Sequence, residues 1–290
     1  MNAPNRIHKA VIPVAGEGKR LRPFTFAVAK AMLPIVDGEN RVRPALHYIL
    51  SEAAAAGIDS AALVVAPARE DLLRQYLEEV RGAGYADLPV NIEFIPQPQP
   101  LGFGHAVLLA GDFVADEPFV LFLGDHVYLA DEGAEPCASQ AVAAFARTGG
   151  KAMVAMRPVG PAELPRVGVA RGRPLPGGEL RCADFVEKPD LATARSRLVT
   201  PGLGEDRFLA HFGIYVFAPV LFDLLSELAA AAKAEGEEIQ LAAAQSMLLQ
   251  RYPDEYYLTR ISGQAYDTGT PSGYLRAQAA MRTVTARGRD

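Results

Sequence analysis

The first half of the chain alternates short apolar runs with amphipathic segments. Residues 9–15, 61–66 and 119–123 are almost wholly apolar, which is typical of strands buried on both faces of a sheet. Between them, residues 44–56 and 69–81 space their apolar positions as helices do. Strands that alternate with helices in this way predict an α/β fold with a doubly wound, mostly parallel sheet.

The pattern changes after about residue 150. Apolar runs at 152–156 and 211–217 predict strands, and we expect a further strand at 183–188. Residues 158–181 are rich in Pro, Gly and Arg, and we assign no element to them. The other expected elements are a half-exposed strand at 90–95, helices at 104–111, 219–233 and 239–250, and a final strand and helix between 256 and 281. We expect one domain over 1–290, with one continuous sheet whose later part forms a second lobe.

Composition narrows the class of protein. With 290 residues, 50% hydrophobic positions and a mean hydropathy of +0.07, the chain is expected to be globular. A net charge of −5 argues against binding to nucleic acid or to a membrane surface. Cys137 and Cys182 are too few for a disulfide framework or a zinc site, and neither a signal peptide nor a membrane span is evident. We therefore expect a cytoplasmic protein.

The segment after the first strand has the residues of a phosphate cradle. Gly16 and Gly18 allow unusual backbone angles and close approach of an anion, and Lys19, Arg20 and Arg22 follow at once. The Walker pattern and the full dinucleotide fingerprint are both absent. The alternative is a tight turn followed by solvated basic residues.

Charged residues at predicted strand ends offer further chemistry. Asp125 and Asp267 could bind Mg²⁺, although each is also explained as a turn or cap residue. Glu187 could accept sugar hydroxyls and Lys188 could reach a phosphate, but solvated charges at a strand end are the alternative. Lys30 is either a phosphate clamp or a surface lysine.

Several motifs in sequence resemble one family, the sugar-1-phosphate nucleotidylyltransferases. They are Val11–Arg20, Ala29–Val36, Gln97 with Gly102–Val107, Leu123–Asp125, Val186–Pro189, Glu238–Leu241 and Asp267–Gly269 with Gly273-Tyr274. The resemblance extends from about Lys9 to Met281. The motifs Gly102–Val107 and Glu238–Leu241 are similar to those of the uridylyltransferase branch.

This resemblance implies a Rossmann-like nucleotidyltransferase fold with a smaller sugar-binding lobe. The nucleotide-binding half would be about 9–150, and the sugar-binding half with the C-terminal helices about 151–282. The implied substrates are UTP and glucose-1-phosphate, the implied cofactor is Mg²⁺, and the implied assembly is a homodimer or homotetramer. The sugar phosphate oxygen would attack the nucleotide α-phosphorus and release pyrophosphate.

The resemblance also implies a role for each matching residue. The expected contacts are Ala15, Gly16 and Gly18 on the nucleotide, Arg20 and Lys30 on phosphates, Gln97 and Gly102 on the uracil edge, Asp125 and Asp267 on Mg²⁺, Gly168, Glu187 and Gly213 on the glucose, and Lys188 on its phosphate.

Two other functions stay open. Lys19 stands where the family often has Thr, and Arg20–Thr25 and Leu123–Asp125 are similar to the thymidylyltransferase branch, so dTTP or another sugar phosphate could be the substrate. A non-catalytic homologue would be favoured by replacement of Arg20, Lys30 or the two aspartates, and all four are present.

Overall fold

The computed structural model describes residues 7–232 and 237–283. The strands are β1 (Lys9–Pro13), β2 (Pro34–Val36), β3 (Val42–Pro44), β4 (Ser60–Val65), β5 (Asn91–Pro96), β6 (Phe119–Phe122), β7 (His126–Ala130), β8 (Ala152–Val159), β9 (Gly168–Pro174), β10 (Leu180–Glu187), β11 (Phe208–Phe217), β12 (Tyr256–Arg260) and β13 (Gly263–Asp267).

The α-helices are α1 (Phe24–Ala27), α2 (Ala45–Ala55), α3 (Pro67–Gly82), α4 (Phe103–Leu108), α5 (Gly111–Val114), α6 (Cys137–Thr148), α7 (Leu191–Arg197), α8 (Val220–Ala231), α9 (Leu241–Arg251) and α10 (Pro271–Met281). Three short 3-10 helices are η1 (Lys19–Leu21), η2 (Lys30–Met32) and η3 (Pro161–Arg166). Every helix in the described residues is too short or too polar to cross a membrane. The expected end of one helix at residue 233 lies outside the described residues.

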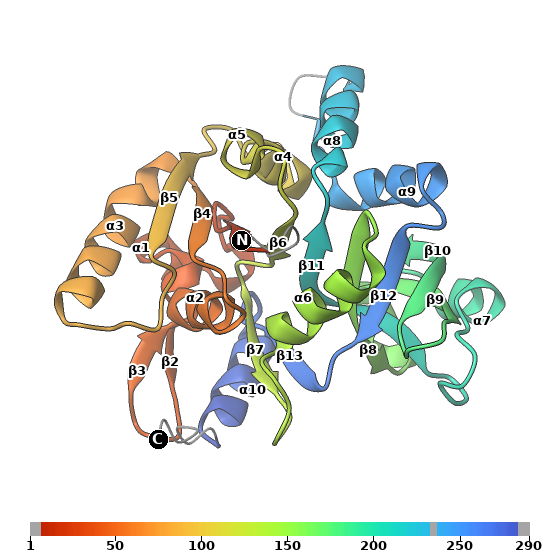
Figure 1. Cartoon of the computed structure of the whole chain (residues 1–290). Helices are drawn as coiled ribbons and strands as arrows, with labels where there is room; N and C mark the ends of the chain where they lie inside the picture. Colours follow the sequence, from red (N-terminus) through yellow and green to blue (C-terminus); the bar gives the residue numbers. More distant parts are fainter. Residues whose placement is uncertain (1–6, 233–236, 284–290) are drawn as a thin grey trace, which may run out of the picture.

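A nine-stranded sheet forms the centre of the protein, in the order β5-β4-β1-β6-β11-β8-β12-β10-β9 (Figure 1). Its first four strands pair in parallel, because helical connections return the chain to the same edge. Strand β11 then pairs antiparallel with both β6 and β8, and β10 pairs antiparallel with β9 and β12. The α/β class is confirmed and the sheet is mixed, as expected, but parallel pairing dominates only in its N-terminal half.

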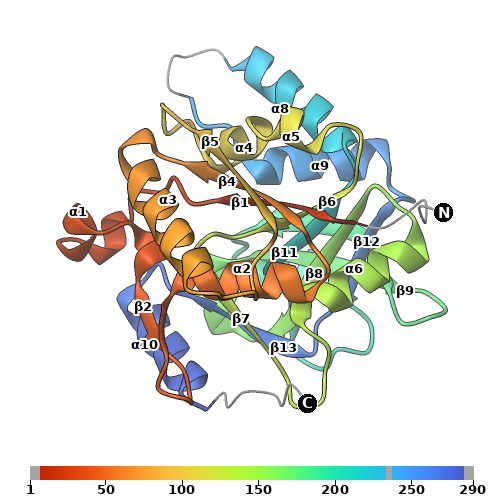
Figure 2. The same ribbon diagram turned by 60° about the vertical axis from the view of Figure 1, so that its left-hand side comes forward.

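Helices cover both faces of this sheet (Figure 2). Alternate residues of the buried strands point to opposite faces, so Ala10 and Ile12 pack with helices α2, α3 and α6. Val11 points the other way and belongs to the core under α4, α5, α8 and α9. This two-sided burial explains why the first strands are continuously apolar in sequence.

Several elements were not expected from the sequence pattern, among them α6, β7, β9 and η3. Helix α6 buries Ala138, Ala141, Ala144 and Phe145 at helical spacing, so its pattern was present in the sequence but was overlooked. Strand β7 follows a sharp turn directly after β6. Strand β9 and helix η3 lie within the stretch of Pro, Gly and Arg to which no element was assigned. Long-range pairing with β10 and β11 stabilises β9 despite this composition.

Strand β11 contains an irregularity that shapes the neighbouring turn. Its register with β8 shifts between His211 and Tyr215, and Gly213 adopts a positive φ of 100°. The Gly213 carbonyl accepts hydrogen bonds from the Leu123 backbone N–H at 3.1 Å and from the Tyr128 hydroxyl at 2.7 Å. Gly213 therefore holds the end of β6, from which Asp125 projects.

A substitution at Gly213 tests this packing. A Cβ there would lie 3.1 Å from Leu123 and 3.2 Å from the Tyr128 hydroxyl, whereas a Cβ at Gly149, also at positive φ, meets no described atom within 4 Å. We expect Gly149→Ala to lower the free energy of unfolding by about 1 kcal/mol through backbone strain alone. Gly213→Ala should lower it by about 2–4 kcal/mol, because crowding adds to strain. Urea denaturation measures both, and equal losses would contradict the proposed crowding.

Candidate active site

A cleft of about 480 Å³ lies at the carboxyl ends of β1, β5 and β6. Residues from the C-terminal half complete its walls, including Arg166, Lys188 and Glu238. Nine of the residues predicted from the sequence line it, namely Ala15, Gly16, Arg20, Lys30, Gln97, Gly102, Asp125, Lys188 and Asp267. Four other predicted residues are described but do not line it, namely Gly18, Gly168, Glu187 and Gly213.

Two carboxylates from distant parts of the chain meet in this cleft. Strands β7 and β13 pair antiparallel, and their register sets Asp267 directly opposite His126. The backbone N–H of Thr268 donates to the Asp125 carbonyl at 2.8 Å, which fixes the two strand ends together. As a result, Asp125, His126 and Asp267 each offer a ligand atom within 4.8 Å of the others.

Cationic side chains offset these carboxylates. The Lys30 ammonium forms an ion pair with Asp125, and His126 Nδ1 lies 2.8 Å from the other oxygen of the same carboxylate. Arg20 is 4.0 Å from the Asp267 carboxylate. Burial by itself would raise the pKa of Asp125, but the His126 hydrogen bond and the Lys30 and His126 charges outweigh it, so that pKa lies well below its usual range. Asp125 is therefore a carboxylate at neutral pH.

This donor set fits a divalent cation. Carboxylate oxygens are hard ligands of the kind that Mg²⁺, Mn²⁺ and Ca²⁺ prefer. Asp125 and Asp267 are only partly exposed, with 25% and 32% of their side chains accessible, so they are both held in place and reachable from the cleft. Within the described residues, this is the group of ligand side chains close enough to hold a metal.

The loop after β1 forms one wall of the cleft. Gly18 has a φ of 66°, and a Cβ there would lie 2.8 Å from Thr25, whose hydroxyl donates to the Gly18 carbonyl. Gly18 thus shapes the loop without lining the cleft. A Cβ at Gly16 would meet no described atom within 4 Å, so Gly16 leaves the cleft side open.

Of the three cations that follow this loop, only Arg20 lines the cleft. Lys19 and Arg22 both pair with Glu17, at 3.4 Å and 3.0 Å. Both ion pairs are exposed on the surface. Lys19 and Arg22 therefore match the alternative interpretation, in which a tight turn is followed by solvated basic residues.

A buried amide lies at the opposite wall. Gln97 is 7% exposed, and its Nε2 lies 3.2 Å from the Gly102 carbonyl and 3.0 Å from His105 Nδ1. Gly102 has a φ of 96°, and its segment is fixed to the C-terminal half by backbone bonds with Ile239. The two halves therefore build this wall together.

Two further cations project from the C-terminal half. Lys188 lines the cleft and has a positive φ of 49°, which is rare and strained for a side-chain-bearing residue. Its backbone N–H donates to the Val167 carbonyl at 3.1 Å, next to Arg166, the other cation of this wall. Strain at a cleft residue is typical of functional positions.

A second group of predicted residues lies beside Lys188. Gly168 pairs with Glu187 across β9 and β10, and a Cβ at Gly168 would lie 2.8 Å from the Glu187 carboxylate and 3.0 Å from His211 Nδ1. Lys188 Nζ is 3.5 Å from Glu187, so this group adjoins the cleft at Lys188.

Several cleft residues were not predicted as ligands from the sequence, among them His126, Arg166 and Glu238. His126 follows Asp125 directly in the sequence, but its position opposite Asp267 depends on the long-range β7–β13 pairing. Arg166 lies in the segment with no assigned element. Glu238 belongs to a motif that was noted, but it had no assigned contact.

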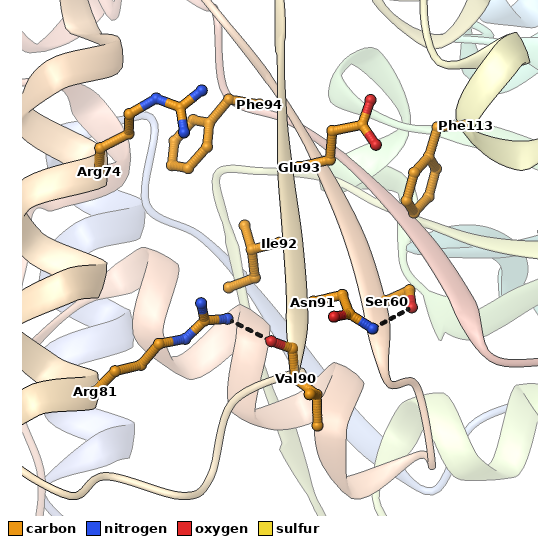
Figure 3. Close-up of a pocket in the computed structure, with 9 residues that line it drawn as sticks. All are labelled: Ser60, Arg74, Arg81, Val90, Asn91, Ile92, Glu93, Phe94 and Phe113. Atoms are coloured by element: carbon orange, nitrogen blue, oxygen red, sulfur yellow. Dashed lines mark hydrogen bonds between the residues drawn. The ribbon is translucent and has the colours of Figure 1, made fainter.

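A shallower cavity of about 600 Å³ lies along β5 (Figure 3). Its cations are engaged within the protein, because Arg74 stacks over Phe94 at 4.2 Å and pairs with Glu70. Arg81 donates to the Val90 carbonyl at 2.9 Å. The candidate active site is therefore the smaller cleft, which gathers the carboxylates and the lysines.

Comparison with known proteins identifies clear relatives. The nucleotidyl transferase family matches residues 9–284. UTP–glucose-1-phosphate uridylyltransferase 2 of Staphylococcus saprophyticus is 32% identical over 286 residues, which cover 93% of this chain and 90% of that protein. UTP–glucose-1-phosphate uridylyltransferase of Bacillus subtilis is 32% identical over 287 residues, covering 93% and 89%.

A solved structure is similar over almost the whole chain. The crystal structure of UDP-glucose pyrophosphorylase complexed with UDP-glucose superposes with a TM-score of 0.76 at 27% identity. The match covers 95% of this chain and 98% of that one.

The half-buried imidazole of His211, whose Nε2 atom is inaccessible to solvent, predicts a pH-dependent stability. Its ring stacks on Phe185 at 4.8 Å, its Nε2 has no hydrogen-bond partner among the described residues, and burial lowers its pKa to about 4. Unfolding restores a pKa of about 6.5, so the unfolded state binds more protons and stability falls as pH drops below that value. We expect this group to remove about 2 kcal/mol of stability between pH 7.5 and pH 5.

Urea denaturation of the wild type and His211→Phe at both pH values measures this contribution. Phenylalanine keeps the stacked ring but cannot titrate, so the variant should lose about 2 kcal/mol less than the wild type. His47, whose pKa is also lowered by burial, contributes equally to both proteins. Identical pH slopes would show that His211 is not held neutral by the fold.

Proposed function

Because this chain belongs to the nucleotidyl transferase family, we propose that it transfers a uridylyl group from UTP to glucose-1-phosphate. An oxygen of the sugar phosphate attacks the α-phosphorus of UTP and forms the new phosphorus–oxygen bond. The bond from the α-phosphorus to the oxygen that bridges to the β-phosphate breaks, and pyrophosphate leaves with that electron pair. The products are UDP-glucose and pyrophosphate.

The observation that carries this proposal is the convergence of lysines, arginines and carboxylates in one cleft. Lys30, Asp125 and Asp267 come from separate parts of the sequence, yet they gather at the strand ends where ligands of α/β folds bind. The cleft volume of about 480 Å³ lies in the range of small-molecule sites. Relatives named for this reaction match over almost the whole chain.

Charge neutralisation is the main task of such a site. Both substrates are anions, and the attacking phosphate oxygen is already ionised near neutral pH, so no general base is required. Arg20 and Lys30 on one wall and Lys188 on the other would offset the repulsion and stabilise the leaving pyrophosphate. Replacement of one of these cationic side chains by a neutral one should raise the activation free energy of the transfer step by about 2–4 kcal/mol, as the removal of an oxyanion-hole donor does in other enzymes.

Asp125 and Asp267 would hold Mg²⁺ in this proposal. The ion would neutralise phosphate charge as a Lewis acid when bound. The Lys30 ammonium, which contacts Asp125, would then turn to the nucleotide phosphates. The two carboxylates are set by strand pairing and need no rearrangement of the backbone.

The remaining roles follow the two halves of the chain. The half at 9–150 would bind the nucleotide through Ala15, Gly16, Gln97 and Gly102, with Gly18 shaping the loop. The half at 151–282 would bind glucose through Gly168, Glu187 and Gly213, with Lys188 on its phosphate. Assembly into a homodimer or homotetramer stays a prediction for solution measurement.

A nucleotide panel tests the reaction. With glucose-1-phosphate and Mg²⁺, we expect pyrophosphate release from UTP to exceed that from dTTP, CTP, GTP and ATP by at least about tenfold in kcat/KM, since the relatives named for this reaction use UTP. A preference for dTTP would support the same reaction with thymine in place of uracil as the base of the nucleotide substrate. No release with any nucleotide would contradict the proposed function.

Substitution of the two carboxylates tests the metal assignment. We expect Asp125→Asn and Asp267→Asn each to lower kcat by about 10²-fold or more, because an amide neither carries charge nor binds Mg²⁺ as strongly. Circular dichroism should report an intact fold. Asp112→Asn, a change on α5 outside the cleft, is the matched control and should keep normal turnover. Near-normal turnover in both cleft variants would contradict the Mg²⁺ assignment.

A further inference from the structure

The hydrogen bonds of Gln97 fix the direction of its side-chain amide. A backbone carbonyl can only accept a hydrogen bond, so the group 3.2 Å from the Gly102 oxygen must be the NH₂ end of Gln97. The same nitrogen lies 3.0 Å from His105 Nδ1. Its second N–H therefore points at His105, and Nδ1 must carry a lone pair.

His105 is suited to this acceptor role. Burial lowers its pKa, which keeps the imidazole neutral near pH 7. The neutral tautomer with its proton on Nε2 leaves Nδ1 free to accept. If Nδ1 were protonated, two donors would face each other and the amide would favour the opposite orientation.

The Gly102 carbonyl is held in position by its backbone neighbours. It also accepts from the Ala106 backbone N–H at 3.2 Å, at the start of α4. Ile239 donates to the Leu101 carbonyl and accepts from the Gly104 N–H, both at 2.8 Å. A Cβ at Gly102 would lie 2.7 Å from the Ile239 carbonyl, so this backbone cannot move toward the C-terminal half.

With both N–H groups engaged, the amide oxygen is the free end of Gln97. Oε1 has no hydrogen-bond partner among the described residues, and it is not one of their buried, unpartnered polar atoms. It therefore keeps access to the cleft, which Gln97 lines although only 7% of the residue is exposed. The Gln97 side chain therefore offers the cleft a hydrogen-bond acceptor.

We propose that His105 is a positioning residue that sets the Gln97 amide so that Oε1 accepts from a base N–H. This inference rests on the proposed nucleotide site. Uracil carries a donor at N3 between two carbonyl groups, whereas cytosine carries a lone pair at N3. An acceptor held in one orientation binds the uracil edge and repels the cytosine edge. His105 thus controls the discrimination of UTP from CTP without touching the nucleotide.

Two substitutions of similar shape separate this role from packing. An asparagine side chain would place its oxygen where Nδ1 lies, so His105→Asn keeps the acceptor, whereas His105→Leu removes it. Calorimetry gives the dissociation constants of UTP and CTP with Mg²⁺ for the three proteins. We expect His105→Leu to lower the UTP over CTP preference by at least about tenfold, which is about 1.4 kcal/mol. His105→Asn should stay within about threefold of the wild type.

Two results would overturn the inference: an unchanged preference in His105→Leu, or an equal loss in both variants. Turnover is not needed for this measurement, so a protein that binds UTP selectively through His105 but releases no pyrophosphate would contradict only the proposed function. Thermal unfolding shows whether both variants fold.

A nucleotide analogue tests the same hydrogen bond in the unaltered protein. UTP methylated at N3 has no N–H to donate, and we expect it to bind the wild type at least about tenfold more weakly than UTP. Equal binding of UTP and the methylated analogue would overturn the inference whatever the variants show.

Discussion

The site depends on holding two carboxylates side by side. Two negative charges within 4.8 Å repel each other by roughly 3–4 kcal/mol at an effective dielectric of about 20, before solvent screening. The β7–β13 ladder and the Thr268 bonds to the Asp125 carbonyl impose the arrangement through backbone geometry. Lys30 and His126 then supply the compensating charge and hydrogen bond. Lys30 lies on η2, and its ion pair with Asp125 is part of the cleft wall. A bound cation would offset the same repulsion.

The joining of the two halves of the sheet determines how the cleft is closed. Strand β11 returns antiparallel beside β6, so a strand of the C-terminal half supports the turn that carries Asp125. On the other wall, Ile239 exchanges backbone bonds with the segment 101–104. Both halves of the chain contribute to the cleft, so a shift between them would move Asp125 and the segment 101–104 relative to their supports.

Local patterns in the sequence were sufficient to predict strands β1, β4 and β6. These strands are continuously apolar because both of their faces are buried. Strand β9 could not be predicted in this way, because its Gly and Arg content is tolerated only through pairing with β10 and β11.

In the candidate site, too, local sequence could name single residues but not their contacts. Asp125 and Lys30 each stand next to an apolar run and could be named, but their ion pair joins residues 95 positions apart. His126 gains its place only from the pairing of β7 with β13. Sequence motifs thus identified ligand types, and strand register decided which of them converge.

The glycines show that a motif residue can be required for reasons other than ligand contact. Gly18 and Gly213 have positive φ, a Cβ at either would have a neighbour within 3.2 Å, and neither lines the cleft. Gly168 makes room for the Glu187 carboxylate. Gly16 differs from these three, because open space surrounds it and its missing side chain widens the cleft itself. A glycine in such a motif therefore indicates a constraint on the backbone first, and contact with a ligand only where the surrounding space faces the cleft.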